Sequence, residues 1–207
     1  MFGIDVSENN GYVDWDAVKD AGVEFVIVRS SYGRNNADDM FLHNVNEAHD
    51  RGIICGAYHY GYGLTPYQAK QEAENCREVI EDAGVLLELP VFYDMEDADG
   101  YKKRNGFDFN YVNCTEICRT FLENINLNSG IYASESWFND YIDWISLDCP
   151  VWNASWVDGE FYDFDSALEE SYEDGIQAYL WQFTDKFVIN GKVFDGNIMY
   201  DSRDTAR

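Results

Sequence analysis

Residues 40–58, MFLHNVNEAHDRGIICGAY, contain the pattern from which the fold follows. Residues 40–51 form a predicted helix that ends at Gly52, because glycine is the preferred residue just past a helix, where φ is positive. The apolar run 53–58 follows at once. Such a run predicts a strand that is buried on both faces, as in a parallel sheet.

The same order of helix, glycine and apolar strand recurs on both sides of this segment. Gly22, Gly52 and Gly84 end the three helices and lie 30 and 32 residues apart, which is the size of a βα unit. The predicted helices are residues 14–21, 40–51, 66–83, 110–124 and 134–141, and the predicted strands are residues 23–28, 53–58, 85–93, 130–133, 151–156, 178–184 and 187–189.

The last third of the chain has strands without a long amphipathic helix between them. Asn190-Gly191 follows one of these strands and is a strong hairpin signal. The pattern predicts an α/β fold in one domain over residues 1–207, an irregular TIM-like barrel of about five βα units followed by three β-strands. An open doubly wound sheet is the alternative. It fits less well, because no Gly-rich phosphate turn follows the first strand.

The composition excludes several classes of partner. The 207 residues include 14 Lys+Arg and 39 Asp+Glu, a net charge of −25, with 46% hydrophobic and 16% aromatic residues. The aromatic content argues against a disordered acidic tail. No basic residue lies between Arg119 and Lys186, so nucleic acid and an anionic membrane surface are not expected partners. No apolar run approaches the roughly 20 residues of a membrane span, and the first residues lack the features of a signal peptide.

The cysteines and histidines predict no metal site and no cofactor. The five cysteines contain no CxxC pair and are interpreted as buried or half-buried thiols. His43 and His49 are six residues apart and lie on different faces of one predicted helix. His59, between two tyrosines, is expected to be a packed or hydrogen-bonded residue of the barrel rather than a base.

The clearest chemical signal is Tyr93-Asp94-Met95-Glu96, at the end of an apolar strand. Active sites of βα barrels lie at the carboxyl ends of the strands. Strand alternation puts Asp94 and Glu96 on one face, with Cβ atoms about 6.5–7 Å apart. Two like charges this close raise one pKa, so one carboxyl can stay protonated as a general acid. An exposed acidic loop is the simpler interpretation of the same residues.

Further polar and aromatic residues fall at predicted strand ends. Asp5 lies inside the apolar run 2–6, where a charge must be satisfied or used, although it could cap a turn. Asp195 could equally belong to an Asp-Gly turn. The other candidates at strand ends are Arg29, Tyr58, Tyr132, Trp156 and Trp181. An aromatic ring suits the C–H face of a pyranose and an acid suits its hydroxyls, so these residues together indicate a carbohydrate ligand.

Taken together, these motifs resemble the glycoside hydrolase family 25 lysozymes from about Gly3 to Tyr200. The resemblance rests on GIDVS from Gly3, AYHY from Ala57, YDME from Tyr93, GIY from Gly130, WQFT from Trp181 and FDGN from Phe194. It implies an irregular barrel of five βα units and three strands. It also implies hydrolysis, at the cell wall, of the β-1,4 bond between N-acetylmuramic acid and N-acetylglucosamine in peptidoglycan.

The resemblance also implies a role for each candidate. Glu96 would protonate the leaving oxygen, and Asp94 would steady the substrate's own N-acetyl group as an internal nucleophile. Asp5 and Asp195 would complete the acidic cluster. Tyr58, Tyr132, Trp156 and Trp181 would line sugar subsites with support from Arg29. Two other functional classes stay open, a glycan-binding barrel without catalysis and a phosphodiesterase that holds Mg²⁺ or Ca²⁺ on the same acids.

Overall fold

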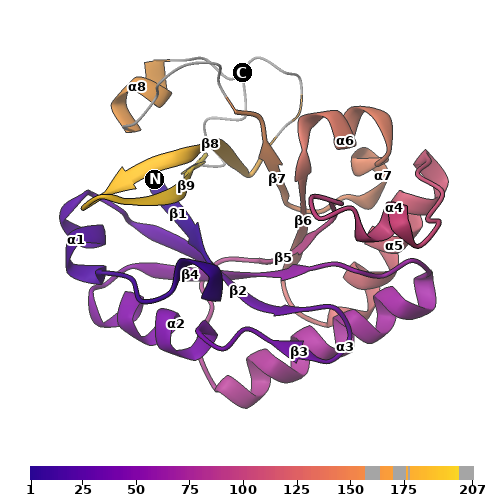
Figure 1. The fold of residues 1–207 in the computed structure, drawn as a ribbon, viewed down its shortest axis with the longest axis horizontal. Helices are drawn as coiled ribbons and strands as arrows, with labels where there is room; N and C mark the ends of the chain where they lie inside the picture. Colours follow the sequence, from indigo (N-terminus) through magenta and orange to yellow (C-terminus); the bar gives the residue numbers. More distant parts are fainter. Residues whose placement is uncertain (157–163, 170–175, 177, 201–207) are drawn as a thin grey trace.

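In the computed structural model, which describes residues 1–156, 164–169, 176 and 178–200, strands and helices alternate around a closed barrel (Figure 1). The strands are β1 (Phe2–Val6), β2 (Phe25–Tyr32), β3 (Asn36–Ala37), β4 (Ile54–Tyr60), β5 (Val91–Asp94), β6 (Ser129–Ser134), β7 (Val151–Ala154), β8 (Leu180–Ile189) and β9 (Lys192–Met199). The helices are the 3-10 helix η1 (Glu8–Asn10) and α1 (Trp15–Asp20), α2 (Phe41–Asp50), α3 (Pro66–Ala83), α4 (Tyr101–Arg104), α5 (Tyr111–Ile125), α6 (Glu135–Asp140), α7 (Trp144–Leu147) and α8 (Phe164–Glu169).

The sheet confirms the predicted barrel. Strands β1, β2, β4, β5, β6, β7 and β8 pair in parallel in that order. Strand β9 runs antiparallel to both β8 and β1 and closes the sheet. Five strand–helix units, ending with β6, α6 and α7, therefore precede the three strands β7, β8 and β9. The short β3 only extends the edge of β2.

Side chains that alternate along the strands fill two separate apolar regions. Phe25, Ile27, Phe92, Trp152 and Leu180 pack with one another inside the barrel. Their neighbours along the strands face the helices and join the larger core between sheet and helices. Both faces of the central strands are therefore buried, as their continuous apolar runs predict.

The prediction of a strand over 85–93 is wrong for its first six residues, because β5 begins only at Val91. The Glu88 carboxylate accepts the Cys55 N–H at 2.9 Å, and Leu89 N–H donates to the Cys55 carbonyl. Pro90 has no N–H to give to a ladder. Local bonds to the start of β4 thus take the place of a longer strand.

The predicted strands 178–184 and 187–189 are one strand, β8, whose pairing with β9 shifts register twice. The predicted hairpin turn is confirmed. Asn190 and Gly191 have φ of 49° and 78°, the positive values that a two-residue type I′ turn requires. The turn leads directly into β9, which carries Asp195.

The predictions for the thiols and for His59 are confirmed. All five cysteines are free; four are buried and Cys149 is partly exposed. His59 is fully buried, and its Nδ1 lies 2.8 Å from the Ser31 hydroxyl oxygen. Burial, followed by the nearby Lys102 charge, lowers the pKa of His59 to about 3, which keeps the ring neutral. In the described part of the chain, no helix is long and apolar enough to cross a membrane.

Gly130→Ala tests the packing of the barrel wall. A Cβ on Gly130 would lie 2.2 Å from the carbonyl oxygen of Pro150 and 2.9 Å from the Phe92 ring. Because the nearest atom belongs to the backbone, relief requires a shift between β6 and the residues before β7. We expect a loss of about 1–3 kcal/mol in the free energy of unfolding, measured in urea. Ser129→Ala, one residue earlier, is the control, and equal stability of the two variants would contradict this packing.

Candidate active site

A cavity of about 190 Å³ opens at the carboxyl end of the parallel strands. Strands β1, β2, β4, β5, β6, β7, β8 and β9 each contribute at least one side chain to it, as does η1. The lining residues are Asp5, Asn9, Arg29, Tyr58, Tyr60, Asp94, Glu96, Tyr132, Trp152, Gln182 and Asp195.

All four predicted carboxyls lie on this cavity. Asp5 in β1 and Asp195 in β9 are direct partners in the antiparallel register. Asp94 is the last residue of β5, and Glu96 follows two positions later on the same side. Met95 between them is buried in the outer core, which is the alternation that the strand predicts.

Asp5 is held by two amide side chains. Gln182 Nε2 and Asn197 Nδ2 both donate to Asp5 Oδ2, at 3.0 and 2.8 Å. The Gln182 Oε1 in turn accepts the Tyr132 hydroxyl at 2.9 Å and the Trp156 Nε1–H at 3.1 Å. This chain of bonds fixes Asp5 and connects it to two of the predicted sugar-binding aromatics.

Asp5 and Asp195 form the first pair of carboxyls, opposite each other on β1 and β9. Burial, and then the charge of Asp195, raise the pKa of Asp5 well above its usual range. Burial raises the pKa of Asp195 to about 6. The interaction between the two side chains adds to the rise at Asp5 and opposes the rise at Asp195. The two carboxyls therefore lose their protons in two steps that belong to the pair.

Asp94 and Glu96 form a second pair. Burial, and then the charge of Glu96, raise the pKa of Asp94. Asp94 Oδ1 has no hydrogen-bond partner among the residues that the structure describes. Burial raises the pKa of Glu96 to about 7; the Lys102 charge opposes this rise and the Asp195 charge adds to it. Glu96 can therefore hold a transferable proton near neutral pH.

The predicted binding residues take up different places. Tyr58 and Tyr132 line the cavity and are half-buried, whereas Trp156 is 55% exposed and reaches the cavity only through its bond to Gln182. Arg29 also lines the cavity, but its Nε donates to Asp38 at 2.8 Å and its Nη2 pairs with Glu8 at 3.0 Å. Arg29 thus supports η1, which contributes Asn9 to the cavity.

Trp181 lies outside the cavity, contrary to its predicted place among the sugar-binding aromatics. Its ring is 2% exposed and packs in the outer core, and its Nε1–H donates to the Ser155 carbonyl at 2.8 Å. The inward neighbour Gln182 takes the expected position. Residues 180–184 of β8 are buried on both faces, so strand alternation alone does not show which residue points inward. Tyr60, Trp152 and Asn9 also line the cavity.

A second cavity of about 400 Å³ lies beside the first, between the β2–β3 turn, α3 and α4. Tyr60 lines the smaller cavity and Tyr62 the larger, and their ring centroids are 5.0 Å apart. The ring centroids of Tyr62 and Tyr101 are also 5.0 Å apart, and the Tyr62 hydroxyl donates to Asp99 at 3.1 Å. A row of tyrosines therefore leads away from the carboxyls.

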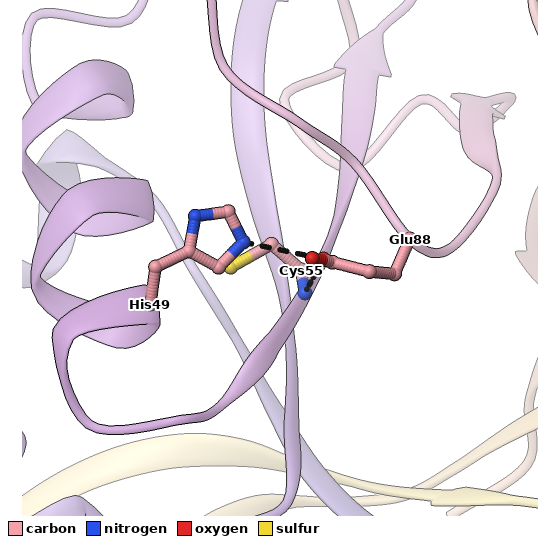
Figure 2. Close-up of side chains that lie close together, drawn as sticks. All are labelled: His49, Cys55 and Glu88. Atoms are coloured by element: carbon pink, nitrogen blue, oxygen red, sulfur yellow. Dashed lines mark hydrogen bonds and ion pairs between the residues drawn. The ribbon is translucent and has the colours of Figure 1, made fainter.

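One group of metal-binding residue types lies at the opposite end of the barrel, where His49, Cys55 and Glu88 meet (Figure 2). The Glu88 carboxylate is 3.2 Å from His49 Nε2 and also accepts the Cys55 N–H. Burial, and then the Glu88 charge, raise the pKa of Cys55 to about 12, so the thiol keeps its proton. These bonds give the group a structural role, because they join α2, β4 and the segment before β5.

The four carboxyls of the cavity do not form a comparable group. Within the described ranges, no three of them bring carboxylate oxygens within 4.8 Å of one another. Oxygen ligands of one Mg²⁺ or Ca²⁺ each lie about 2.0–2.6 Å from the ion, so neighbouring ligand oxygens are usually closer together than 4.8 Å. The arrangement suits two separate proton-sharing pairs better than one cation.

Comparison with known proteins identifies the family of this chain. The sequence profile of "Glycosyl hydrolases family 25" matches residues 4–192. "Lysozyme M1" of Streptomyces globisporus is 45% identical over 58 residues, which cover 28% of this chain and 20% of that protein. "Autolytic lysozyme" of Clostridium acetobutylicum is 26% identical over 201 residues, 93% of this chain and 59% of that protein.

A solved structure shares the fold. The modular autolysin LytC from Streptococcus pneumoniae superimposes with a TM-score of 0.79 at 23% identity, over 96% of this chain and 46% of that one. This chain spans less than two thirds of the length of either curated relative. The profile match covers most of the residues, from β1 to the start of β9, and the chain belongs to glycosyl hydrolases family 25.

Proposed function

We propose that this protein is a lysozyme, an N-acetylmuramidase that hydrolyses the β-1,4 bond between N-acetylmuramic acid and N-acetylglucosamine in peptidoglycan. Its place of action is then the bacterial cell wall. The observation that carries the proposal is the pair Asp94 and Glu96 on the cavity, with the pKa of Glu96 raised to about 7. Family membership and two curated relatives named lysozymes support it.

Glu96 is the general acid of the proposed reaction. Its proton passes to the glycosidic oxygen as the bond from that oxygen to C1 of the muramic acid breaks. The acetamido carbonyl oxygen of the same sugar then bonds to C1. In the second half, the Glu96 carboxylate takes a proton from water as the water oxygen attacks C1 and the acetamido oxygen leaves.

Asp94 orients the acetamido group. A carbonyl oxygen is a better nucleophile when its amide N–H donates to a carboxylate. Asp94 lines the cavity, so we assign its carboxylate to accept that N–H. Because burial and Glu96 raise the pKa of Asp94, the two carboxyls ionise in sequence rather than together.

The surroundings suit a sugar polymer. Tyr132 and Trp156 are joined through Gln182, so one wall carries a half-buried phenol and an exposed indole. The larger cavity next to Tyr60 and Tyr62 offers room for the chain beyond the cleaved bond. LytC, which has the same fold, was solved with a synthetic peptidoglycan ligand.

Digestion of purified peptidoglycan tests the function and separates it from the other two classes. We expect clearing of the suspension and new reducing ends, unchanged in excess EDTA. Binding without new reducing ends would favour a glycan-binding barrel. Activity lost with the chelator and restored by Mg²⁺ or Ca²⁺ would favour a metal-dependent enzyme.

Glu96→Gln should abolish most of the activity. The amide keeps the size of the side chain but has no proton to transfer, so we expect digestion to fall by about 10² to 10³ or more. Glu78→Gln, at an exposed position on α3, is the matched control and should keep full activity. Turnover close to wild type in purified Glu96→Gln would contradict the assignment.

The same variant should not lose stability. The folded protein binds the Glu96 proton more tightly than the unfolded chain, because its pKa rises from the ordinary 4.5 to about 7. Ionising this carboxyl therefore costs stability as pH rises through that window. At pH 8 the thermal midpoint of Glu96→Gln should equal or exceed that of wild type, and a clearly lower midpoint would argue against a strained carboxylate.

Activity on a soluble peptidoglycan fragment should have a bell-shaped pH profile. The alkaline limb should fall near pH 7, where Glu96 loses its proton. The acid limb should lie above the ordinary Asp value of about 3.9, because burial and Glu96 raise the pKa of Asp94. The optimum is then on the acid side of neutrality, and a flat profile from pH 5 to 9 would contradict this arrangement.

A further inference from the structure

Lys102 places a buried positive charge behind the carboxyl pair. It lies on α4, in the connection that follows β5, and it is 1% exposed. Its Nζ donates to the backbone carbonyl of Glu96 at 2.6 Å and to the backbone carbonyl of Gly61. Burying an ammonium group is costly unless it is hydrogen-bonded and compensated by opposite charge. A side chain kept in this place therefore needs an explanation.

The two carbonyls belong to the two segments that carry the site. Gly61 follows directly on β4, which supplies Tyr58 and Tyr60 to the cavity. The second carbonyl is that of Glu96. A single ammonium thus holds the end of β4 against the backbone of the proposed acid.

The helix that carries Lys102 is fixed by the same loop. The Asp97 carboxylate accepts the backbone N–H of Lys102 at 2.6 Å and that of Lys103 at 3.1 Å. Asp97 directly follows Glu96 and holds the start of α4, and Lys102 on α4 bonds back to the Glu96 carbonyl. These bonds close a ring that restricts the backbone of Glu96.

The charges around Lys102 are mostly negative. Acids from three elements act on it: Glu72 of α3, Asp94 of β5, and Glu96 and Asp97 of the following loop. Burial alone would favour the neutral amine, and these acids oppose that effect. The Glu72 carboxylate is itself engaged, since it accepts the Tyr93 hydroxyl at 2.9 Å and the Tyr62 N–H at 2.8 Å.

Among the charges that act on Glu96, Lys102 has the largest opposing effect. The titratable groups that act on Glu96 or line the same cavity are Asp5 of β1, Arg29 of β2, Tyr58 and Tyr60 of β4, Asp94 of β5, Asp97 and Asp99 of its own loop, Lys102 of α4, Tyr132 of β6 and Asp195 of β9. The acids favour the protonated form of Glu96, and the ammonium favours the carboxylate. A proton donor that must also act as a base needs both forms within reach.

We infer that Lys102 is a positioning residue for the proposed muramidase reaction, whose ammonium fixes the backbone of Glu96 and balances the surrounding acids so that Glu96 can both give up and regain its proton. The inference rests on the proposed function. Lys102 itself touches no substrate in this account and acts only through Glu96.

Lys102→Met removes the charge and the two hydrogen bonds but keeps an unbranched side chain. We expect the alkaline limb of the pH profile to move up by about one pH unit or more, since a nearby opposite charge typically shifts a carboxyl by that amount. On a soluble peptidoglycan fragment, kcat should fall about tenfold or more, as for a displaced reacting group, with KM little changed. Lys103→Met, the exposed neighbour on α4, should match wild type in both respects.

A structural role alone would move a different readout. A folded Lys102→Met with lower kcat but an unshifted pH profile, or with unchanged kinetics, would overturn the proposal. Lys102→Arg keeps the charge and should restore the alkaline limb even where kcat stays low. If it does not, the charge is not what sets the limb.

Carbon-13 NMR of the Glu96 carboxyl gives a readout that needs no activity. Its titration midpoint should be higher in Lys102→Met than in wild type, and an equal midpoint would overturn the inference. If Lys102→Met does not fold, nitrogen-15 NMR of the wild-type side chain decides. Lys102 must remain an ammonium up to pH 7, and a neutral amine there would overturn the inference. A wild type that leaves peptidoglycan intact would instead refute the proposed function, while both NMR measurements would still test Lys102.

Discussion

The barrel closes through one antiparallel strand, and this closure brings Asp195 directly opposite Asp5. Parallel strands connected by helices carry β1 to β8 around the barrel. The chain then turns back at Asn190-Gly191, and β9 fills the remaining place between β8 and β1 (Figure 1). The return strand also supplies Asn197, which holds Asp5. The geometry that completes the sheet therefore also assembles one of the two carboxyl pairs.

Burying two carboxyl pairs in one cavity opposes folding, and the structure compensates by specific means. Amide donors hold Asp5, and a buried ammonium lies behind Glu96. Asp94 keeps one buried oxygen, Oδ1, without a hydrogen-bond partner in the described residues. An unmet hydrogen-bonding group at the centre of a site is typical of a place where stability is given up for function. We therefore interpret the raised pKa values as a consequence of the site and not of the overall acidity of the chain.

Much of the fold could be predicted because its signals are local. The first three helices each end at a glycine that an apolar segment follows, and the hairpin carries its own Asn-Gly turn. The start of β5 could not be predicted, because residues 85–90 are apolar enough for a strand. They stay out of the sheet because Glu88 bonds to the Cys55 N–H and because Pro90 has no N–H to donate.

Asp94 and Glu96 were recognisable since a strand end fixes their face. Trp181 and Gln182 were not distinguishable, because both faces of β8 are buried. The meeting of His49, Cys55 and Glu88 depends on three elements whose relative placement no local pattern encodes.

The hairpin that closes the barrel also extends past it. Strand β8 pairs with β7 only from Leu180 to Gln182, whereas its remaining length pairs with β9 alone. This projecting part is held at its tip, because Asn190 Nδ2 donates to Asp14 at 3.1 Å and Lys192 Nζ donates to the Tyr12 carbonyl at 2.7 Å. Two bonds to the segment before α1 make the hairpin a fixed wall of the molecule rather than a flap. Since β9 of this hairpin carries Asp195, fixing the wall also fixes the distance between the two carboxyl pairs, and with it the electrostatic effect of Asp195 on Glu96.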